Sequence, residues 1–303
     1  MVGSVGFAAS GWPGQTRRIR PLTPLLPLLL ALAFAGAAAD ATPVEVYAAG
    51  DIADCRRVPA NESVAYHTAR LIPPGAPVLV LGDTLYKYAT AENFAACYEP
   101  TWGVHRTTTL AVRGNHDYLP GRADDFRAYF GDRAGVDGHF ARRLGAWLVI
   151  GIDSDPSTED LDRHYQWLEA TLEQNRDTRC TLAMWHEPLF SSGLHRGSGA
   201  HMQRFWALLD RHGAEVVLNG HEHFYEAFDP LDADGHPVAE GIREFVVGTG
   251  GAPLHWFWRP PYTSRARILR HGVLHLTLRE DGYSWEFRDV DGSVADPGSA
   301  TCR

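Results

Sequence analysis

The sequence contains a single lysine, Lys87, among 28 lysine and arginine residues, and its basic residues form no stripe. Aspartate and glutamate number 37, so the formal net charge is −9. A protein that binds nucleic acid through a charged surface needs clustered cations to neutralise phosphates, and this composition argues against such a partner. An acidic protein that handles phosphate needs another source of positive charge.

Heptads, fixed-period repeats and low-complexity segments are also missing, and the 30 glycines and 19 prolines are scattered. This excludes collagen-like, coiled-coil and largely disordered chains. With 303 residues, 45% apolar and 21% charged, the chain can bury a sizeable core. No proline-, serine- or glycine-rich linker interrupts residues 42–303, which we therefore expect to form one catalytic domain.

The longest apolar run, residues 22–35, is shorter than the roughly 20 residues that a membrane span needs. Arginines precede it within residues 17–20, and three alanines follow at residues 37–39. This pattern predicts a secretory signal peptide over residues 1–39, with a positive segment, a short apolar segment and a cleavage site of small residues. A membrane anchor is the alternative. With cleavage, we expect a secreted or periplasmic protein without membrane attachment.

The predicted mature chain has four cysteines, Cys55, Cys97, Cys180 and Cys302. None of them forms a Cys-x-x-Cys pair, which argues against a cysteine zinc site. An even number in an exported chain indicates two disulfides, and three pairings are possible. We favour Cys55–Cys97 and Cys180–Cys302, because Cys55 and Cys97 each follow a Gly-Asp turn.

Short apolar runs rich in β-forming residues each end in a glycine-containing turn, at residues 44–49, 78–81 and 109–112. Helix-compatible segments separate them, at residues 62–71 and 91–97. This alternation predicts an α/β fold. Further strands are expected at residues 140–152 (a pair), 181–185, 216–218, 244–247, 273–278 and 283–289, with helices at 160–173 and 203–212.

Five of the turns that follow predicted strands carry side chains of the types that bind metals. These are Asp51, Asp83 with Tyr86, Asn115 with His116, His186, and His221 with His223. Each alone has an ordinary structural explanation as a turn residue, a helix cap or a buried histidine. In open α/β sheets, however, ligands bind beyond the carboxyl ends of the strands, so the five turns should converge. Carboxylate, amide and imidazole groups together suit a pair of transition-metal ions.

The order of these motifs resembles the calcineurin-like metallophosphoesterase superfamily, and within it the purple acid phosphatases. The resemblance implies a two-sheet βα sandwich with its metal site at the carboxyl ends of the strands. Most of the superfamily has a histidine two residues after the first aspartate, where this sequence has Ala53. The purple acid phosphatases share this absence and use a tyrosine three residues after the second aspartate, where Tyr86 follows Asp83.

The resemblance also implies the ligands and the two ions. The first metal would take Asp51, Tyr86, His223 and the bridging Asp83, and the second would take Asp83, Asn115, His186 and His221. A phenolate ligand favours Fe(III) at the first site, because an ordinary phenol has a pKa near 10. The second site suits Zn(II), Fe(II) or Mn(II). Such ions would supply the positive charge that the chain lacks.

Two histidines resemble the family's acid groups, His116 after the amide ligand and His195 nine residues beyond His186. The alternatives are that His116 only orients Asn115 and that His195 is an ordinary loop residue. Glu187 and Glu222 could orient the neighbouring ligands. The aromatic segment 254–262 could line the cleft or simply cover the core.

Three functions remain open at this point. The leading hypothesis is an exported phosphomonoesterase that acts on a small phosphate ester through a metal-bound hydroxide, since the sequence lacks a Gly-x-Ser-x-Gly nucleophile motif. The second is a phosphodiesterase acting on nucleotides or phospholipid headgroups with the same ions. The third is a metal-bearing binding protein without turnover.

Overall fold

The computed structural model describes residues 42–119, 123–135, 137–154, 161–195, 198–259 and 263–303, together with glycines 3, 6, 11 and 14. Apart from those glycines, the predicted signal peptide lies outside the described residues, as do residues 260–262 of the aromatic segment. The chain divides into two units, residues 1–39 and 40–303, and the second contains the fold. In the described part, no helix has the length and apolar character needed to cross a membrane.

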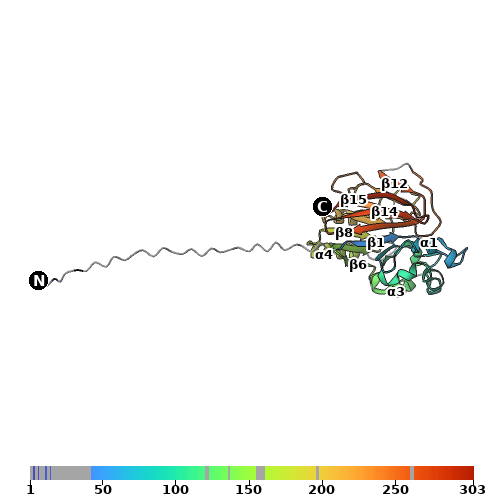
Figure 1. The fold of residues 1–303 in the computed structure, drawn as a ribbon, viewed down its shortest axis with the longest axis horizontal. Coiled ribbons are helices and arrows are strands. Elements are labelled where there is room, and N and C mark those ends of the chain that lie inside the picture. The colour runs from blue at the N-terminus through green and yellow to red at the C-terminus, as the bar shows by residue number, and fades with distance from the viewer. Residues whose placement is uncertain are drawn as a thin grey trace. The chain divides into compact units, whose positions relative to one another are not determined.

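The first sheet brings together strands from the two ends of this unit. Its order is β15 (Val294–Thr301), β14 (Gly282–Asp289), β13 (Gly272–Leu278), β1 (Val44–Ala49), β3 (Val78–Leu81) and β5 (Thr109–Val112). The neighbours β1, β3 and β5 are parallel, whereas β13 runs antiparallel to β1 and begins an antiparallel group with β14 and β15. In Figure 1 the blue β1 accordingly lies in the same sheet as the red β14 and β15.

The second sheet is mixed and lies mostly in the middle of the sequence. Its order is β12 (Ser264–Ile268), β10 (Tyr225–Phe228), β11 (Arg243–Val247), β9 (Val216–Asn219), β8 (Cys180–Met184), β7 (Trp147–Ile152) and β6 (His139–Leu144). The central neighbours β7, β8, β9 and β11 are parallel, and the outer strands are antiparallel to their neighbours.

The core shows how the layers pack. Along β8, Leu182 and Met184 join the apolar cluster that also contains Val80 of the first sheet. The alternate residue, Ala183, belongs to a second cluster with Phe205 of helix α5 (Gln203–Arg211). Alternation of side chains along a strand therefore buries β8 on both faces. This confirms the predicted two-sheet βα sandwich.

Shorter elements connect the strands. They are β2 (Ala53–Asp54), η1 (Ala60–Glu62), α1 (Val64–Ala69), β4 (Leu85–Tyr86), α2 (Ala91–Asn93), η2 (Phe94–Tyr98), η3 (Trp102–Thr108), η4 (Asn115–Tyr118), α3 (Asp124–Phe130), η5 (Gly131–Arg133), α4 (Leu161–Gln174) and η6 (Ser198–Met202). A helix was predicted over residues 62–71, and the observed helix α1 covers only Val64–Ala69. It begins after Ser63, whose side chain caps it by accepting the Tyr66 N–H. The predicted helix 91–97 is α-helical only in its first three residues and continues as a π-helix.

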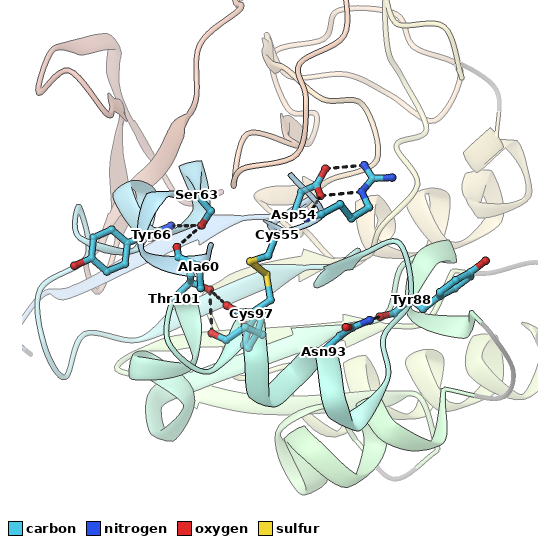
Figure 2. The surroundings of a disulfide bond; sticks show 11 residues. Asp54, Cys55, Ala60, Ser63, Tyr66, Tyr88, Asn93, Cys97 and Thr101 are labelled. Carbon is cyan, nitrogen blue, oxygen red and sulfur yellow. Dashed lines mark hydrogen bonds and ion pairs between the residues drawn. A yellow bond between two sulfur atoms is a disulfide. The ribbon is translucent and has the colours of Figure 1, made fainter. Parts of the chain in front are cut away.

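Both favoured disulfide pairings are confirmed. Figure 2 shows Cys55 bonded to Cys97, with Cα atoms 5.9 Å apart, beside the two-stranded pair β2 and β4. Cys180 at the start of β8 is bonded to Cys302, which follows β15. The second bond therefore joins the two sheets covalently.

Loss of the bond between the sheets should destabilise the fold substantially. The Cys180–Cys302 bond joins residues that are 122 positions apart in the sequence, whereas Cys55 and Cys97 are 42 positions apart. Because longer loops restrict the unfolded chain more, we expect Cys180→Ser with Cys302→Ser to lower the free energy of unfolding by about 2–5 kcal/mol. Denaturant titration followed by tryptophan fluorescence measures this. The matched control is Cys55→Ser with Cys97→Ser, and a larger loss in the control would contradict the prediction.

Candidate metal centre

The first sheet supplies three candidate ligands from the ends of adjacent strands. Asp51 comes after β1, Asp83 after β3 and Asn115 after β5. Since these strands are parallel neighbours, their carboxyl ends lie at one edge of the sheet. The Asp51 N–H donates to the carbonyl of Gly82 over 3.0 Å, which holds the first two turns together.

The second sheet supplies histidines from β8 and β9, which are also parallel neighbours. The Gly220 N–H donates to the His186 carbonyl over 3.0 Å, so the turns after these strands are joined. Two further bonds cross between the sheets. The His221 N–H donates to Asp51 Oδ2 over 2.7 Å, and His186 Nδ1 lies 2.7 Å from the carbonyl of Leu81 in β3. The five turns thus meet at one place.

The Tyr86 hydroxyl lies at the centre of the first group of candidate ligands. Its oxygen is 2.8 Å from Asp51 Oδ1, 2.9 Å from Asp83 Oδ2 and 3.0 Å from His223 Nε2. His223 Nε2 is also 3.1 Å from Asp51 Oδ1. Four donor atoms from three turns therefore lie close together, as the resemblance implies for the first metal.

The second group of candidate ligands adjoins the first through Asp83. While Asp83 Oδ2 faces Tyr86, Asp83 Oδ1 is 3.5 Å from His186 Nε2. His221 Nδ1 lies 3.2 Å from His186 Nε2 and 3.1 Å from Asn115 Oδ1. The two carboxylate oxygens of Asp83 thus face different groups, which is the arrangement that a bridging ligand needs.

Hydrogen bonds set the proton positions on two of the imidazoles. His186 Nδ1 lies 2.7 Å from the carbonyl of Leu81, and His223 Nδ1 lies 2.7 Å from that of Pro253. A carbonyl only accepts, so each Nδ1 carries the proton in the neutral ring and each Nε2 keeps its lone pair. Both free lone pairs face the Asp51–Asp83–Tyr86 cluster. This donor set fits two transition-metal ions.

Burial and crowding of charge strongly perturb the ionisable groups. Burial, with the nearby Asp51 and Asp83, raises the pKa of Tyr86 well above its usual value. Burial opposes ionisation of Asp83, yet the neighbouring His186 holds the pKa of Asp83 below its usual range. For His186, burial is outweighed by the Asp83 carboxylate, which raises its pKa to about 10. The Tyr86 phenol would therefore ionise only beside a strong cation.

The backbone around the cluster adopts conformations that most residues avoid. Asp51, Asp83 and His221 have φ angles of 58°, 49° and 71°. Such left-handed conformations cost about 1–3 kcal/mol each and persist where the surrounding structure enforces them, often at functional sites. At Gly114 a side chain is excluded, because a Cβ would overlap the Asp83 carboxylate.

A cavity of about 430 Å³ opens onto the cluster. Its lining comprises Arg56, Asp83, Tyr86, Asn115, His116, His195, His221, His223, Pro253 and His255. Both histidines predicted as acids are among them. Asp51 and His186 are buried, with exposed fractions of 0% and 1%.

The family model for calcineurin-like phosphoesterases matches residues 33–225, more than half of the chain. The chain belongs to the calcineurin-like phosphoesterase family. The convergent donor set is the candidate metal centre of this family member. No curated protein matches the sequence.

Solved structures share the fold at low sequence identity. Purple acid phosphatase PPD1 from yellow lupin (Lupinus luteus) is 16% identical with a TM-score of 0.71, covering 86% of this chain and 54% of that one. The phosphoesterase thus spans about half the length of the lupin protein. GAP50, described as the anchor in the inner membrane complex of Plasmodium, is 12% identical with a TM-score of 0.65, covering 86% and 90%. PhoD is 12% identical with a TM-score of 0.57, covering 87% and 69%.

His116 contacts the cluster in a way that the sequence did not indicate. Its backbone N–H donates to Asp83 Oδ1 over 2.8 Å, and its ring packs against Tyr86 with centroids 4.5 Å apart. The main chain of His116 therefore orients Asp83, while its imidazole lines the cavity. The next residue, Asp117, accepts the N–H groups of Gly114 and Thr84 and fixes this turn.

His195 is held by Glu222. Its backbone N–H donates to Glu222 Oε1 over 2.7 Å, and its Nδ1 lies 3.5 Å from Oε2 of the same carboxylate. The sequence suggested that Glu222 could orient the neighbouring metal ligands, and the hydrogen bond and ion pair described for its carboxylate are with His195. The ring of His195 lies 5.0 Å from that of His221, between centroids, so the phosphoesterase places it beside the cluster.

The segment between His186 and His195 is fixed by two more fully buried glutamates. Glu244 Oε1 accepts the N–H groups of Leu189 and Phe190 over 3.1 and 3.4 Å. Glu226 accepts the N–H and the hydroxyl of Ser192 over 2.9 and 2.5 Å. Because these carboxylates are buried, water does not compete for their hydrogen bonds, and the bonds hold the loop in place.

Sequence reasoning missed two residues that line the cavity, Arg56 and Pro253, whereas His255 belongs to the segment 254–262 that the sequence suggested could line the cleft. The ring of His255 stacks on that of His223, with centroids 3.9 Å apart and planes 14° apart. The His255 N–H also donates to the His223 carbonyl over 3.0 Å. Arg56 and Pro253 belong to no strand-end motif, so the sequence carried no signal for them. The exposed Trp256 and Trp258 do not line the cavity, whereas His255 does.

The buried Glu244 should make the phosphoesterase less stable as the pH rises. Burial raises its pKa well above the usual value, so its contribution is present below about pH 4.5 and is lost as the pH rises through the folded-state pKa. The glutamine in Glu244→Gln is neutral at every pH, so the variant does not lose this stability as the pH rises. We therefore expect the unfolding free energy of the variant, relative to the wild type, to increase between pH 5 and 8.

Denaturant titrations at matched metal content measure this difference, which can reach about 1.4 kcal/mol per pH unit. The exposed Glu92→Gln serves as the control and should show a flat difference. A pH-independent difference for Glu244→Gln would contradict the prediction.

Proposed function

We propose that the chain is an exported phosphomonoesterase of the purple acid phosphatase type. The observation that carries the proposal is the place of Tyr86. Its hydroxyl lies within 3.0 Å of donor atoms from Asp51, Asp83 and His223. In this sequence Ala53 stands where the superfamily usually has a histidine, and Tyr86, three residues after Asp83, would take its place as a ligand to the first metal.

The donor set supports Fe(III) at the first site. Burial and two carboxylates raise the pKa of Tyr86, so a phenolate there requires a strongly Lewis-acidic ion. Imidazoles and an amide at the second site suit Zn(II), Fe(II) or Mn(II). When bound, two such ions would neutralise charge on phosphate oxygens and make water a better nucleophile at mild pH.

The protein groups position the ester and supply a proton. His116 and His195 both line the cavity and can protonate the leaving oxygen of the alcohol. Burial and the neighbouring His223 lower the pKa of His195, so its donor form is populated under acidic conditions. An acidic pH optimum follows if His195 is the donor.

Export rests on two independent features. Residues 1–39 have the pattern of a cleaved signal peptide, and the two disulfides fit an oxidising compartment. We therefore propose a secreted or periplasmic enzyme with a small phosphate ester as its partner, and without nucleic-acid or membrane binding after cleavage.

Initial rates on a phosphomonoester and its matching phosphodiester, measured from pH 4 to 9 on the metal-replete mature protein, test this function. We expect a monoester preference with an acidic optimum. Asp83→Ala should lose at least ~10³-fold, because two-metal catalysis contributes several kcal/mol.

A diester preference would overturn the phosphomonoesterase proposal in favour of a phosphodiesterase. Rates no higher than those of Asp83→Ala on both substrates would instead indicate a binding protein without turnover.

A further inference from the structure

The cavity contains a cationic side chain that the metal centre does not use. Among the described residues that line it, Arg56 is the one that carries a permanent positive charge. Half of the Arg56 side chain is exposed, whereas Asp83 and Tyr86 are 2% and 8% exposed. Arg56 therefore lies at a more open part of the cavity than the cluster that would hold the reacting phosphate.

Arg56 is held in place by its neighbour Asp54. Its Nε donates to Asp54 Oδ1 over 2.8 Å and its Nη2 donates to Oδ2 over 2.6 Å, the paired contacts drawn at Asp54 in Figure 2. The Arg56 backbone N–H also donates to Asp54 Oδ1, over 3.1 Å. A guanidinium has five N–H donors, so the Nη1 group and one Nη2 hydrogen remain available for another anion.

The backbone on which this pair lies is fixed relative to the candidate metal centre. Asp54 is paired directly with Tyr86 across the β2–β4 ladder. Cys55, between Asp54 and Arg56, is bonded to Cys97. A guanidinium that is already ordered loses little side-chain entropy when it binds an anion.

The surrounding charges favour an anion here. Burial opposes ionisation of Asp54, but the hydrogen bonds from Arg56 keep its pKa below the usual range. Asp54 therefore cancels one positive charge, while Arg57, which also acts electrostatically on Asp54, adds a second. The local group of Asp54, Arg56 and Arg57 carries a net charge of +1 in a chain whose overall charge is −9.

We propose that Arg56 forms a subsite for a second anionic group of the substrate, a carboxylate or phosphate carried by the alcohol part of the ester. This inference rests on the proposed phosphomonoesterase function. The subsite would select esters of acidic alcohols over esters of neutral ones, because a charge-assisted bond to a planar guanidinium is made only by the former.

Ethyl phosphate and phosphoglycolate are a suitable pair of probes, because they differ by one carboxylate. We expect the wild type to have a higher kcat/KM on phosphoglycolate. Arg56→Gln should lower the ratio of the two kcat/KM values, phosphoglycolate over ethyl phosphate, by at least about tenfold. Arg56→Lys, which keeps the charge but loses the planar fork, should give an intermediate ratio. The matched control is Arg57→Gln, whose ratio should fall much less than that of Arg56→Gln, because Arg57 adds only its charge and does not line the cavity.

If the enzyme is active, two outcomes would overturn the Arg56 subsite and leave the proposed function standing. Unchanged kcat/KM values on both substrates in Arg56→Gln mean that Arg56 contacts no second anionic group. An equal loss on both substrates means that Arg56 binds the reacting phosphate instead. If neither ester is hydrolysed faster than by Asp83→Ala, the proposed function fails and the inference fails with it.

Discussion

The candidate centre depends on a contact between two sheets at Asp51. The carboxylate of Asp51 accepts the His221 N–H over 2.7 Å and lies 2.8 Å from the Tyr86 hydroxyl. One side chain from the first sheet thereby joins a turn of the second sheet to the aromatic ligand candidate of β4. The contact of His186 Nδ1 with the Leu81 carbonyl, over 2.7 Å, joins the strand ends of the two sheets at a second point. With both contacts, the strand ends enclose one cluster of donor atoms.

This arrangement is costly for the folded chain. Two buried carboxylates lie beside a phenol whose pKa they raise, and three ligand candidates have left-handed backbone conformations. Packing offsets these costs through an apolar core between the sheets and a second core under the helices. The Cys180–Cys302 bond adds a covalent connection between the sheets. Bound cations would relieve the remaining electrostatic cost, since they turn crowded carboxylates into ligands.

Much of the fold and the core of the candidate site could be predicted from the sequence. Glycine turns that follow apolar runs mark the strand ends, and the strand ends carry the ligand types. The edge strand β15 was missed because it contains Pro297 and Gly298, which weaken a strand pattern and are tolerated at edges. Strand β10 was missed because it begins only two residues after His223.

Arg56 was missed, and His255 was not singled out within the segment 254–262, for a different reason. Their place in the cavity depends on contacts distant in sequence, such as the pairing of β2 with β4 and the stacking of His255 on His223. No local pattern records such contacts. A residue that lines a site through tertiary packing alone is found only when the strand ends, the disulfides and the loops are placed together.

We propose that these side chains hold two metal ions that share Asp83. The most direct measurement is the number of transition-metal ions per chain in the purified, metal-saturated protein, determined by elemental analysis for the wild type and for Asp83→Asn. We expect two ions in the wild type and the loss of at least one in Asp83→Asn. Both should be retained in Asp54→Asn, because the Asp54 carboxylate faces Arg56 instead. Two ions retained in Asp83→Asn, or fewer than two in the wild type, would contradict this proposal.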